Sequence, residues 1–235
     1  MSSEKISYRY WCVKGLGAGG RIALHLANVE FDDNIVTDFK QWFGPDTEEV
    51  SKVNPLVNLP HLKTADGEVI VQSGAVLRYI ARNYKLYGAT DKDMSRVDQV
   101  LEVIVDLRKE LYKLGDSKEE EFEEAKKKFA EETITYFFSG LDKFRTLNGS
   151  KYIAADSLTV ADAVTIDSMF ACAAAYESDV ATVFAAFPAL VAYHADFIEL
   201  PQWKSYTATA MGDAKTPING PGSRFSAMVM PAETA

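Results

Sequence analysis

Cysteine and histidine are scarce in this chain of 235 residues. There are two cysteines, Cys12 and Cys172, and three histidines, His25, His61 and His194, all far apart in sequence. Two distant cysteines provide neither a disulfide framework nor a C-x-x-C redox motif. Isolated histidines lack the ligand spacing of a zinc site. We therefore expect no metal site and a reducing environment.

Long apolar runs and a net positive charge are also missing. No run approaches the roughly 20 apolar residues that a membrane-spanning helix needs, and residues 1–5 form no apolar signal-peptide core. The 34 acidic and 25 basic side chains give a formal net charge of -9, which argues against nucleic acid or an acidic membrane as a partner. The sequence thus indicates an ordinary globular protein of the cytoplasm.

Residues 1–87 have the pattern of an α/β domain. Residues 6–13 are rich in aromatic and β-branched side chains and predict a strand, residues 21–29 have helical apolar spacing, and residues 31–36 predict a second strand. Residues 54–84 then predict a hairpin followed by a helix. The expected order is β-α-β followed by β-β-α.

Beyond residue 88 the pattern is helical throughout. No strand-like alternation follows, and three boxes of the form S/T-x-x-D/E predict helix starts at Thr90, Ser117 and Thr159. The alanine-rich segment after Thr159 is apolar all round, so its helix is expected to lie buried at the centre. We expect an all-α bundle domain over residues 88–210 and a C-terminal tail or lid over residues 211–235.

A glycine pattern follows the first predicted strand. Gly15-x-Gly17-x-x-Gly20 matches the dinucleotide-binding fingerprint G-x-G-x-x-G. However, the strand before it mixes polar and aromatic residues, whereas the strand of a dinucleotide-binding fold is buried on both faces and apolar. Such a fold also needs further βα units, and none follows residue 87. The glycines therefore indicate a flexible loop beside an active site.

Residues 54–84 have features that suit an extended acidic ligand. Pro60 cannot donate to a sheet ladder, so it must lie at the start or the edge of a strand, and a cis bond there would expose the backbone of Leu59 for pairing. Gln72 and Ser73 begin a helix whose first turn offers N–H groups and a positive dipole end to a carboxylate. A serine at a helix start is commonly only a cap, but together with Leu59 and Pro60 it favours a site for a small peptide-like molecule.

Tyr10 lies near the end of the first predicted strand, two residues before Cys12. A tyrosine there is commonly a core aromatic, but its hydroxyl could also donate a hydrogen bond from the strand end to a thiolate. Lowering the pKa of a thiol by two units from near 8.5 requires about 2.7 kcal/mol, and one charge-assisted hydrogen bond supplies roughly 1.5 to 3 kcal/mol. Cys12 is the weaker candidate for thiol chemistry because it lies within the strand and not at a helix N-terminus.

Three motifs together resemble the cytosolic glutathione transferases, and the resemblance covers nearly the whole chain. The most specific is Asn-Leu-Pro at residues 58–60, followed by Gln-Ser-x-Ala-x-x-Arg-Tyr-Ile-Ala at residues 72–81. Ser-Leu-Thr-x-Ala-Asp at residues 157–162 is similar to the capping box of the family's central C-terminal helix. The spacing of the classes that use a tyrosine (mu, pi, alpha and sigma) is kept by Tyr10, Trp11, Gly15 and Arg21.

The resemblance implies a fold, a reaction and a site. The fold is a thioredoxin-like N-terminal domain joined to an all-helical one. In the reaction, Tyr10 stabilises the thiolate of reduced glutathione, which attacks a hydrophobic electrophile, and glutathione is a co-substrate with no further cofactor. The implied glutathione contacts within one subunit are Trp42, Asn58, Leu59, Pro60, Gln72 and Ser73. The resemblance also implies a homodimer, in which Asp106 reaches the glutathione of the neighbouring subunit. Candidates for the electrophile site are Val13, Leu16 and Tyr112.

The chain departs from the family pattern at two places that matter for binding. Asp46 stands where a basic residue is usual, so Lys40 or Lys52 would have to contact the glycine end of glutathione. Leu56 stands where several classes place an aromatic key at the dimer interface. Two other functions remain open: a structural or binding protein that kept the fold without catalysis, and a glutathione-dependent isomerase or peroxidase that uses the same site.

Overall fold

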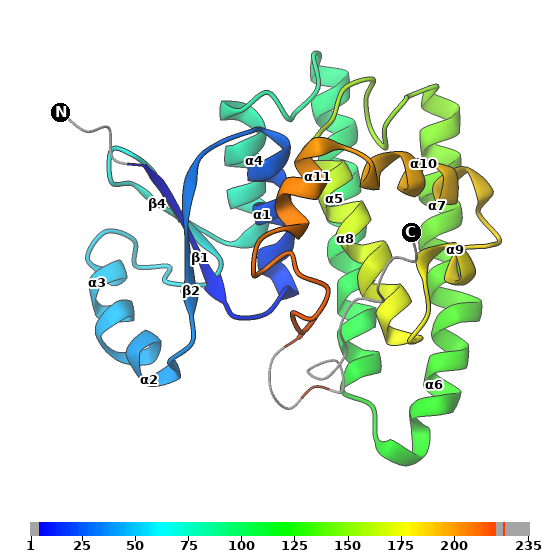
Figure 1. Ribbon diagram of the computed structural model, residues 1–235, viewed down its shortest axis with the longest axis horizontal. Helices are drawn as coiled ribbons and strands as arrows, with labels where there is room; N and C mark the ends of the chain where they lie inside the picture. The colour runs from blue at the N-terminus through cyan, green and yellow to red at the C-terminus, as the bar shows by residue number, and fades with distance from the viewer. Residues whose placement is uncertain (1–4, 220–222, 224–235) are drawn as a thin grey trace.

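The chain folds into a sheet-containing N-terminal part and a helical C-terminal part, which lie side by side in Figure 1. The description rests on a computed structural model and covers residues 5–219 and 223. The predicted fold class is confirmed, since strands and helices alternate up to residue 83 and helices follow from residue 91 onward. No described helix is long and apolar enough to cross a membrane.

Four strands form one mixed sheet in the order β2-β1-β3-β4. Strand β1 (Ile6–Trp11) pairs in parallel with β2 (Phe31–Val36) and antiparallel with β3 (His61–Lys63), which pairs antiparallel with β4 (Val69–Val71). Burial alternates along β1, because successive side chains point to opposite faces of a sheet. Tyr10 therefore lies on the buried face.

Two helices cover the face of the sheet that carries the tyrosines of β1. Helix α1 (Ala18–Leu26) follows a 3-10 turn, η1 (Gly15–Gly17), and packs beside α4 (Ser73–Asn83). The helical conformation thus begins earlier than the expected residues 21–29, and the segment expected to be a flexible loop is itself helical. The apolar side chains of α1 are buried along almost its whole length, as its position between the sheet and the second part requires.

The other face of the sheet carries three short helical segments. These are α2 (Phe39–Gln41), the π-helical turn η2 (Trp42–Asp46) and α3 (Thr47–Ser51). Val50 of α3 packs on the valines of β4. These segments bring residues 42–46 next to the sheet.

The helical part is built around two long helices, α5 (Asp91–Gly115) and α8 (Val160–Ala175), which pack on each other. Almost every residue of α8 is buried, which confirms the expectation of a central helix. The other helical segments are η3 (Glu119–Glu121), α6 (Phe122–Lys128), η4 (Phe129–Ile134), α7 (Thr135–Asn148), α9 (Val180–Val183), α10 (Pro188–Ile198) and α11 (Pro201–Thr207).

Two of the three predicted capping boxes are confirmed. The side chains of Thr90 and Asp93 cap α5 reciprocally, and those of Thr159 and Asp162 cap α8. At Ser117 the predicted helix start is two residues early, because the helical segment begins at Glu119 of η3 with Lys118 as its N-cap. The Ser117 hydroxyl donates to the carbonyl of Leu114 at 2.8 Å, in the last turn of α5.

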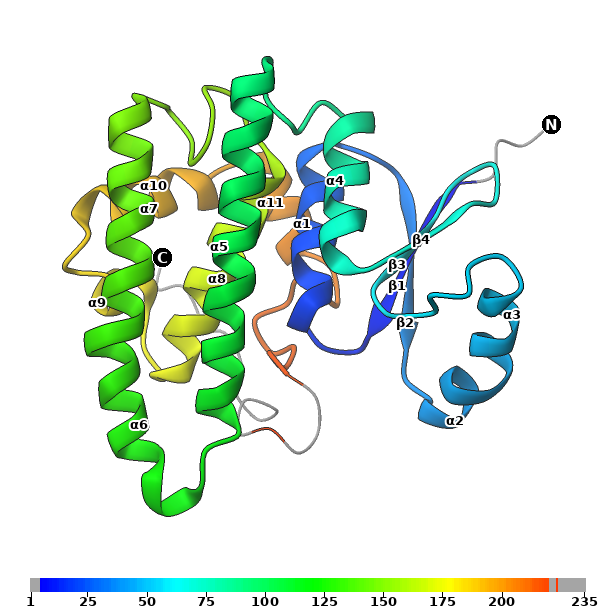
Figure 2. The ribbon, with the colours of Figure 1, turned by 180° about the vertical axis from the view of Figure 1, so that it is seen from behind.

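The two parts meet along α1, which packs against both α8 and α11. Both views in Figures 1 and 2 show α11 and the orange segment after it between α1 and the long helices of the second part. Residues 211–219 of the predicted tail or lid are described and lie in this position. The expectation for residues 220–222 and 224–235 falls outside the described part of the chain.

Candidate functional site

Tyr10 lies one residue before the end of β1 and is only 7% exposed. Its hydroxyl oxygen accepts a hydrogen bond from the backbone N–H of Leu16 at 3.1 Å. Burial raises the pKa of the Tyr10 hydroxyl to about 12, against the smaller opposing effect of the Leu16 N–H. The hydroxyl therefore keeps its proton at neutral pH. Because the Leu16 contact uses only an acceptor position of the oxygen, that proton can be donated to a ligand.

The glycines after β1 leave room for the two tyrosine rings. A Cβ atom at Gly17 would lie 2.2 Å from Cδ1 of Tyr10, and one at Gly20 would lie 2.5 Å from the hydroxyl oxygen of Tyr8. Gly15 has a φ of 39°, and a Cβ atom there would lie 2.8 Å from the Tyr10 hydroxyl. The G-x-G-x-x-G spacing thus serves close packing around Tyr10 and Tyr8.

We expect Gly17→Ala to lower the free energy of unfolding by about 2 kcal/mol, because the added methyl group must displace the buried Tyr10 ring. Gly140→Ala is the matched control, since no atom lies within 4 Å of the position that its methyl group would take on α7. We expect that control to gain roughly 0.5 to 1 kcal/mol from its better helix propensity. Denaturant unfolding of both variants provides the comparison, and equal stability of Gly17→Ala and the parent would contradict the packing argument.

Helix α5 ties the loop that carries Leu16 to the helical part. Arg108 of α5 donates through Nη1 to the carbonyl of Gly15 at 2.8 Å and forms an ion pair with Asp167 of α8. Burial raises the pKa of the Asp167 carboxyl, and the Arg108 guanidinium opposes that shift. The position of the Leu16 N–H, and with it the hydrogen bond to Tyr10, therefore depends on a buried ion pair between two helices of the other part.

Trp42 lies against the outer face of the sheet and is buried. The guanidinium carbon of Arg9 lies 5.7 Å from its ring centroid, and Arg9 forms an ion pair with Asp46. The carboxylate that stands at the expected basic position is thus neutralised by a neighbour from β1. Lys40 and Lys52, the residues expected to substitute for it, are both exposed.

The peptide bond between Leu59 and Pro60 is cis, and β3 begins at the next residue. Pro60 therefore lies immediately before a strand, as its missing N–H predicts. The N–H of Leu59 is occupied in this state, because the side-chain oxygen of Asn58 accepts from it at 2.8 Å. A ligand that pairs with the Leu59 N–H must displace the Asn58 side chain.

Gln72 stands between β4 and α4 with φ of 72° and ψ of 121°. Positive φ is uncommon for a residue other than glycine and often marks a functional position. Gln72 makes no side-chain hydrogen bond to the first turn of α4, in which Ser73 is the first residue. The Gln72 side chain is exposed and Ser73 is half-buried, so both can reach a ligand at this helix N-terminus.

Asp106 lies on α5 of the helical part. Its carboxylate is 63% exposed and accepts from the ammonium group of Lys109 at 2.9 Å on the same helix. Residues two apart on a helix do not face each other, so Asp106 and Arg108 point in different directions. Within one chain, Asp106 faces solvent.

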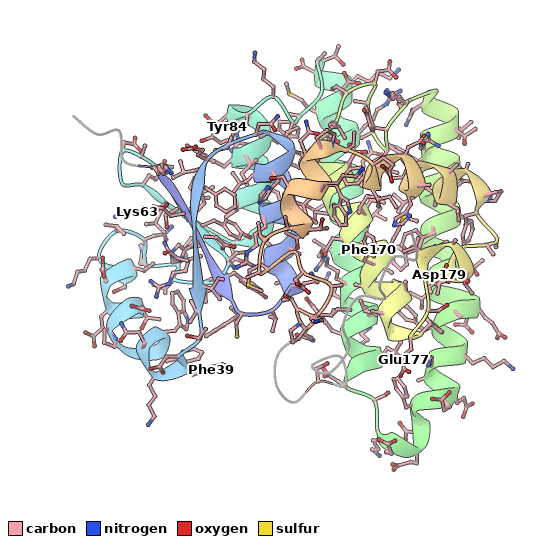
Figure 3. All side chains as sticks on the ribbon, viewed as in Figure 1. Phe39, Lys63, Tyr84, Phe170, Glu177 and Asp179 are labelled. Carbon is pink, nitrogen blue, oxygen red and sulfur yellow. The ribbon has the colours of Figure 1, made fainter. Side chains whose placement is uncertain are left out.

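A small cavity lies between the two parts and close to the loop after β1. Its volume is about 10 Å³, and its lining includes Gly15, Arg108, Leu111, Tyr112, Phe170 and Ile218. Of the three residues expected at an electrophile site, Tyr112 lines this cavity. Val13 is buried and directly precedes Lys14, which also lines it, whereas Leu16 is 37% exposed. Phe170, labelled in Figure 3, belongs to α8, and its ring stacks on that of Trp203 in α11 at 5.2 Å.

Sequence reasoning missed three charged residues around this cavity: Lys14, Arg108 and Asp167. A signal existed for Asp167, because a carboxylate within an otherwise apolar helix needs a partner. Nothing in the sequence indicated that Lys14 would be buried. Among residues 5–219 and 223, no group of three or more His, Cys, Asp or Glu side chains could hold a metal ion.

Comparison with known proteins identifies the family. The profile described as the glutathione S-transferase N-terminal domain matches residues 19–83, and that of the C-terminal domain matches residues 105–210. Glutathione S-transferase 1 of Ascaris suum is 31% identical over 203 residues, which cover 85% of this chain and 93% of that protein. Human glutathione S-transferase Mu 3 is 30% identical over 160 residues, which cover 64% of this chain and 68% of that protein.

Solved structures agree in fold. The crystal structure of the glutathione S-transferase Blo t 8 superposes with a TM-score of 0.76 at 24% identity, covering 94% of this chain and 99% of that one. The glutathione S-transferase from Ascaris lumbricoides gives a TM-score of 0.68 at 28% identity, covering 87% and 97%. The chain therefore belongs to the glutathione S-transferase family and is an enzyme of that class.

Proposed function

We propose that this enzyme transfers the thiolate of reduced glutathione to hydrophobic electrophiles and that Tyr10 stabilises the thiolate. Glutathione is the co-substrate of the family. The proposal rests on the buried Tyr10 hydroxyl. Burial raises its pKa to about 12, so the hydroxyl keeps its proton. Its contact with the Leu16 N–H uses only an acceptor position of the oxygen. The hydroxyl can therefore act as a hydrogen-bond donor to a thiolate over the whole physiological pH range.

One hydrogen bond from Tyr10 can supply the free energy that the shift of the thiol pKa requires. A thiol of pKa near 8.5 is mostly protonated at pH 7, and lowering its pKa by two units takes about 2.7 kcal/mol. A hydrogen bond to a charged partner contributes roughly 1.5 to 3 kcal/mol. In the proposed mechanism the Tyr10 hydroxyl donates a hydrogen bond to the sulfur without transferring its proton, and the thiol proton leaves to solvent. The sulfur lone pair then forms the new C–S bond. With an aryl halide the carbon–halogen bond breaks and the halide leaves, and with an epoxide a C–O bond breaks and its oxygen takes a proton from solvent.

The peptide part of glutathione would lie along the segment from Asn58 to Pro60. The Leu59 N–H and carbonyl would pair with the cysteinyl unit, and Trp42 and Asn58 would contact the glycine end. Binding then exchanges one hydrogen bond for another, because the Asn58 oxygen must first leave the Leu59 N–H. Arg9 supports this arrangement by neutralising Asp46, whose charge would otherwise repel the glycine carboxylate.

The γ-glutamyl end would be held at the N-terminus of α4. Gln72 and Ser73 offer side chains and a helix dipole end of the correct sign for a carboxylate. The γ-glutamyl amino group needs an acidic partner, and in a homodimer the exposed Asp106 would supply it to the neighbouring subunit's site. The enzyme would then work as a homodimer in the cytoplasm, with Val13, Leu16 and Tyr112 next to the electrophile.

Glutathione binding tests this half of the proposal separately from catalysis. We expect Gln72→Ala to weaken the binding of glutathione about tenfold or more in isothermal titration calorimetry, because it removes one polar contact to a charged ligand group. Gln99→Ala on the exposed face of α5 is the control and should bind as the parent does. Equal affinity of the two variants would contradict the placement of the γ-glutamyl end, and a parent protein that binds no glutathione would overturn the proposed function.

A further inference from the structure

Arg108 of α5 and Tyr10 of β1 contact the same peptide unit. That unit joins Gly15 to Leu16, so it carries the carbonyl of Gly15 on one side and the N–H of Leu16 on the other. Arg108 donates from Nη1 to this carbonyl at 2.8 Å, and the Leu16 N–H donates to the Tyr10 hydroxyl oxygen at 3.1 Å. Two consecutive hydrogen bonds therefore connect a guanidinium group of the helical part to the hydroxyl of the sheet.

The two hydrogen bonds strengthen each other. An amide group that accepts a hydrogen bond at its oxygen is polarised, and its N–H becomes a stronger donor. The donor at the Gly15 carbonyl is a cation, and hydrogen bonds of charged donors are about twice as strong as those of neutral ones. The Leu16 N–H then withdraws more electron density from the Tyr10 oxygen, so the O–H of Tyr10 becomes a better donor to an anion.

Asp167 of α8 holds Arg108 in place for this contact. The Arg108 side chain is only 11% exposed, and its Nη2 group donates to a carboxylate oxygen of Asp167, which is also buried. Helix α8 packs on both α1 and α5, where the two parts of the chain meet (Figures 1 and 2). Because a buried arginine needs a paired carboxylate, the ion pair fixes the guanidinium group beside the Gly15 carbonyl.

Two cations act on Tyr10, and they reach it by different routes. Burial raises the pKa of the Tyr10 hydroxyl, the Leu16 N–H lowers it, Tyr112 of α5 raises it, and Arg108 and Arg21 lower it. Arg21 of α1 faces the aromatic ring, with its guanidinium carbon 6.0 Å from the ring centroid. Arg108 is the cation that is linked by hydrogen bonds to the oxygen that a thiolate would contact.

We propose that Arg108 is a positioning residue for the conjugation reaction, which holds and polarises the peptide unit between Gly15 and Leu16 so that Tyr10 donates more strongly to the glutathione thiolate. This inference rests on the proposed function and adds to it a residue from the helical part. The negative charge of Asp167 opposes that of Arg108, so the ion pair sets how far the thiolate is stabilised. The thiolate site on the sheet is then complete only when α5 and α8 pack against it.

The pKa of the thiol of bound glutathione, measured from thiolate absorbance against pH, tests the effect of the charge. Arg108→Gln should raise it by about 0.5 to 1 unit, less than the 1 to 3 units of a direct contact between opposite charges. Arg108→Lys keeps the charge, so its thiol pKa should lie closer to that of the parent than to that of Arg108→Gln. An unchanged thiol pKa in Arg108→Gln would overturn the inference.

Arg96→Gln is the matched control for the loss of charge. Arg96 also belongs to α5 and forms an ion pair with Asp93, so the control removes the same charge and breaks an ion pair of the same helix. Because Arg96 has no link to the loop after β1, we expect its thiol pKa to equal that of the parent. A rise as large as that in Arg108→Gln would overturn the specific role of Arg108.

Asp167→Asn separates the effect of charge from a loss of packing. This variant and Arg108→Gln disturb the same ion pair, so a merely structural role would move the thiol pKa in the same direction in both. The inference predicts opposite directions, because without the carboxylate the charge of Arg108 is less compensated and the thiol pKa falls. A rise in both variants would overturn the effect of the charge.

Lys14 is the other cation beside Asp167, and it changes with this variant too. Burial lowers the pKa of Lys14 to about 8, against the opposing effect of Asp167, so the pKa of Lys14 falls further in Asp167→Asn. The Lys14 ammonium group contacts the carbonyls of Met211 and Asp213 and not that of Gly15. Loss of its charge therefore offsets only part of the expected fall of the thiol pKa.

The route through the hydroxyl is tested by a double-mutant cycle with Tyr10→Phe. In that background the hydroxyl is absent, so Arg108→Gln should change the thiol pKa by less than half as much as it does in the parent. An equal change in both backgrounds would show that Arg108 acts on the sulfur directly and would overturn the route through the peptide unit.

The amide proton resonance of Leu16 in the protein without glutathione separates this inference from the proposed function. A weaker hydrogen bond moves an amide proton upfield, so the Leu16 resonance should move upfield in Arg108→Gln and stay in place in Arg96→Gln. An unchanged resonance in Arg108→Gln would overturn the inference. A parent that does not lower the thiol pKa of glutathione, together with the upfield shift in Arg108→Gln, would overturn the proposed function and support the polarisation of Leu16 by Arg108.

The two Arg108 variants also cover a failure of Asp167→Asn to fold. Arg108→Lys and Arg108→Gln differ in charge at the same position, so the contrast between their thiol pKa values then decides the effect of the charge. Equal values in the two variants would overturn it.

Discussion

Tyr10→Phe is expected to lower kcat/KM for the conjugation of glutathione by about ten- to a thousandfold, equivalent to roughly 1.4 to 4 kcal/mol of transition-state stabilisation. The substitution removes the one proton that the buried hydroxyl can donate to the thiolate and leaves the ring in place. The Leu16 N–H loses its acceptor, at a cost of roughly 1 to 3 kcal/mol, which is a fraction of the about 5 to 15 kcal/mol that stabilises a folded protein. We therefore expect a folded protein that still binds glutathione.

Tyr8→Phe on the same strand is the matched control. Tyr8 is fully buried on the same face, and its hydroxyl donates to the carbonyl of Gly17 at 2.9 Å. Its loss should cost about 1 kcal/mol of stability and change kcat/KM by no more than about threefold. Equal losses of activity in the two variants would show that the effect of Tyr10→Phe is a packing effect.

Asp162→Ala is expected to cause the largest loss of stability, about 3 to 5 kcal/mol of the free energy of unfolding. Asp162 is fully buried at the start of α8. One carboxylate oxygen accepts from the Ile153 N–H at 3.0 Å and the Tyr193 hydroxyl at 2.7 Å, and the other accepts from the N–H and the hydroxyl of Thr159, both at 2.8 Å. Alanine leaves four buried donors without an acceptor, and each unsatisfied donor costs roughly 1 to 3 kcal/mol, with less than full additivity.

The surface cap Asp179, labelled in Figure 3, provides the comparison. It accepts from the N–H and the hydroxyl of Thr182, both at 2.8 Å, at the start of the short helix α9. Asp179→Ala removes an exposed cap of the same chemistry, so water replaces the acceptor and the expected loss is about 1 kcal/mol. The losses of unfolding free energy in the two variants, measured by thermal or denaturant unfolding, should therefore differ severalfold. A loss of 1 kcal/mol or less in Asp162→Ala would contradict the role assigned to burial.

The fold could be predicted from sequence where local pattern and burial agree. The aromatic and β-branched residues around Tyr10 and the proline at residue 60 predict strands, and the boxes at Thr90 and Thr159 predict helix starts whose caps the structure confirms. At Ser117 the helical segment begins two residues later than the box predicts, and the same hydroxyl donates to the last turn of the helix before it. A short polar pattern does not decide between these two uses.

The candidate site could be predicted only for residues that stand in a recognisable motif. Gln72, Ser73 and the segment from Asn58 to Pro60 were found in this way, and their contacts to glutathione stay predictions. The burial of Lys14 could not be foreseen, because its partners are backbone carbonyls almost 200 residues away, which carry no sequence signal. The neutralisation of Asp46 by Arg9 was likewise invisible, since it depends on which face of β1 lies against η2.

Residues 14–16 link Tyr10 to two distant parts of the chain. The N–H groups of Lys14 and Gly15 donate to the carbonyls of Pro217 and Ile218, and the N–H of Leu16 donates to the Tyr10 hydroxyl. Arg108 of α5 donates to the Gly15 carbonyl in addition.

The pKa of the thiol of enzyme-bound glutathione tests the central claim most directly. It can be measured from the ultraviolet absorbance of the thiolate as a function of pH, in the parent protein and in Tyr10→Phe. We predict a pKa about two units below the reference value near 8.5 in the parent and a return toward that reference in the variant. A thiol pKa that is the same in both proteins would contradict the role of Tyr10.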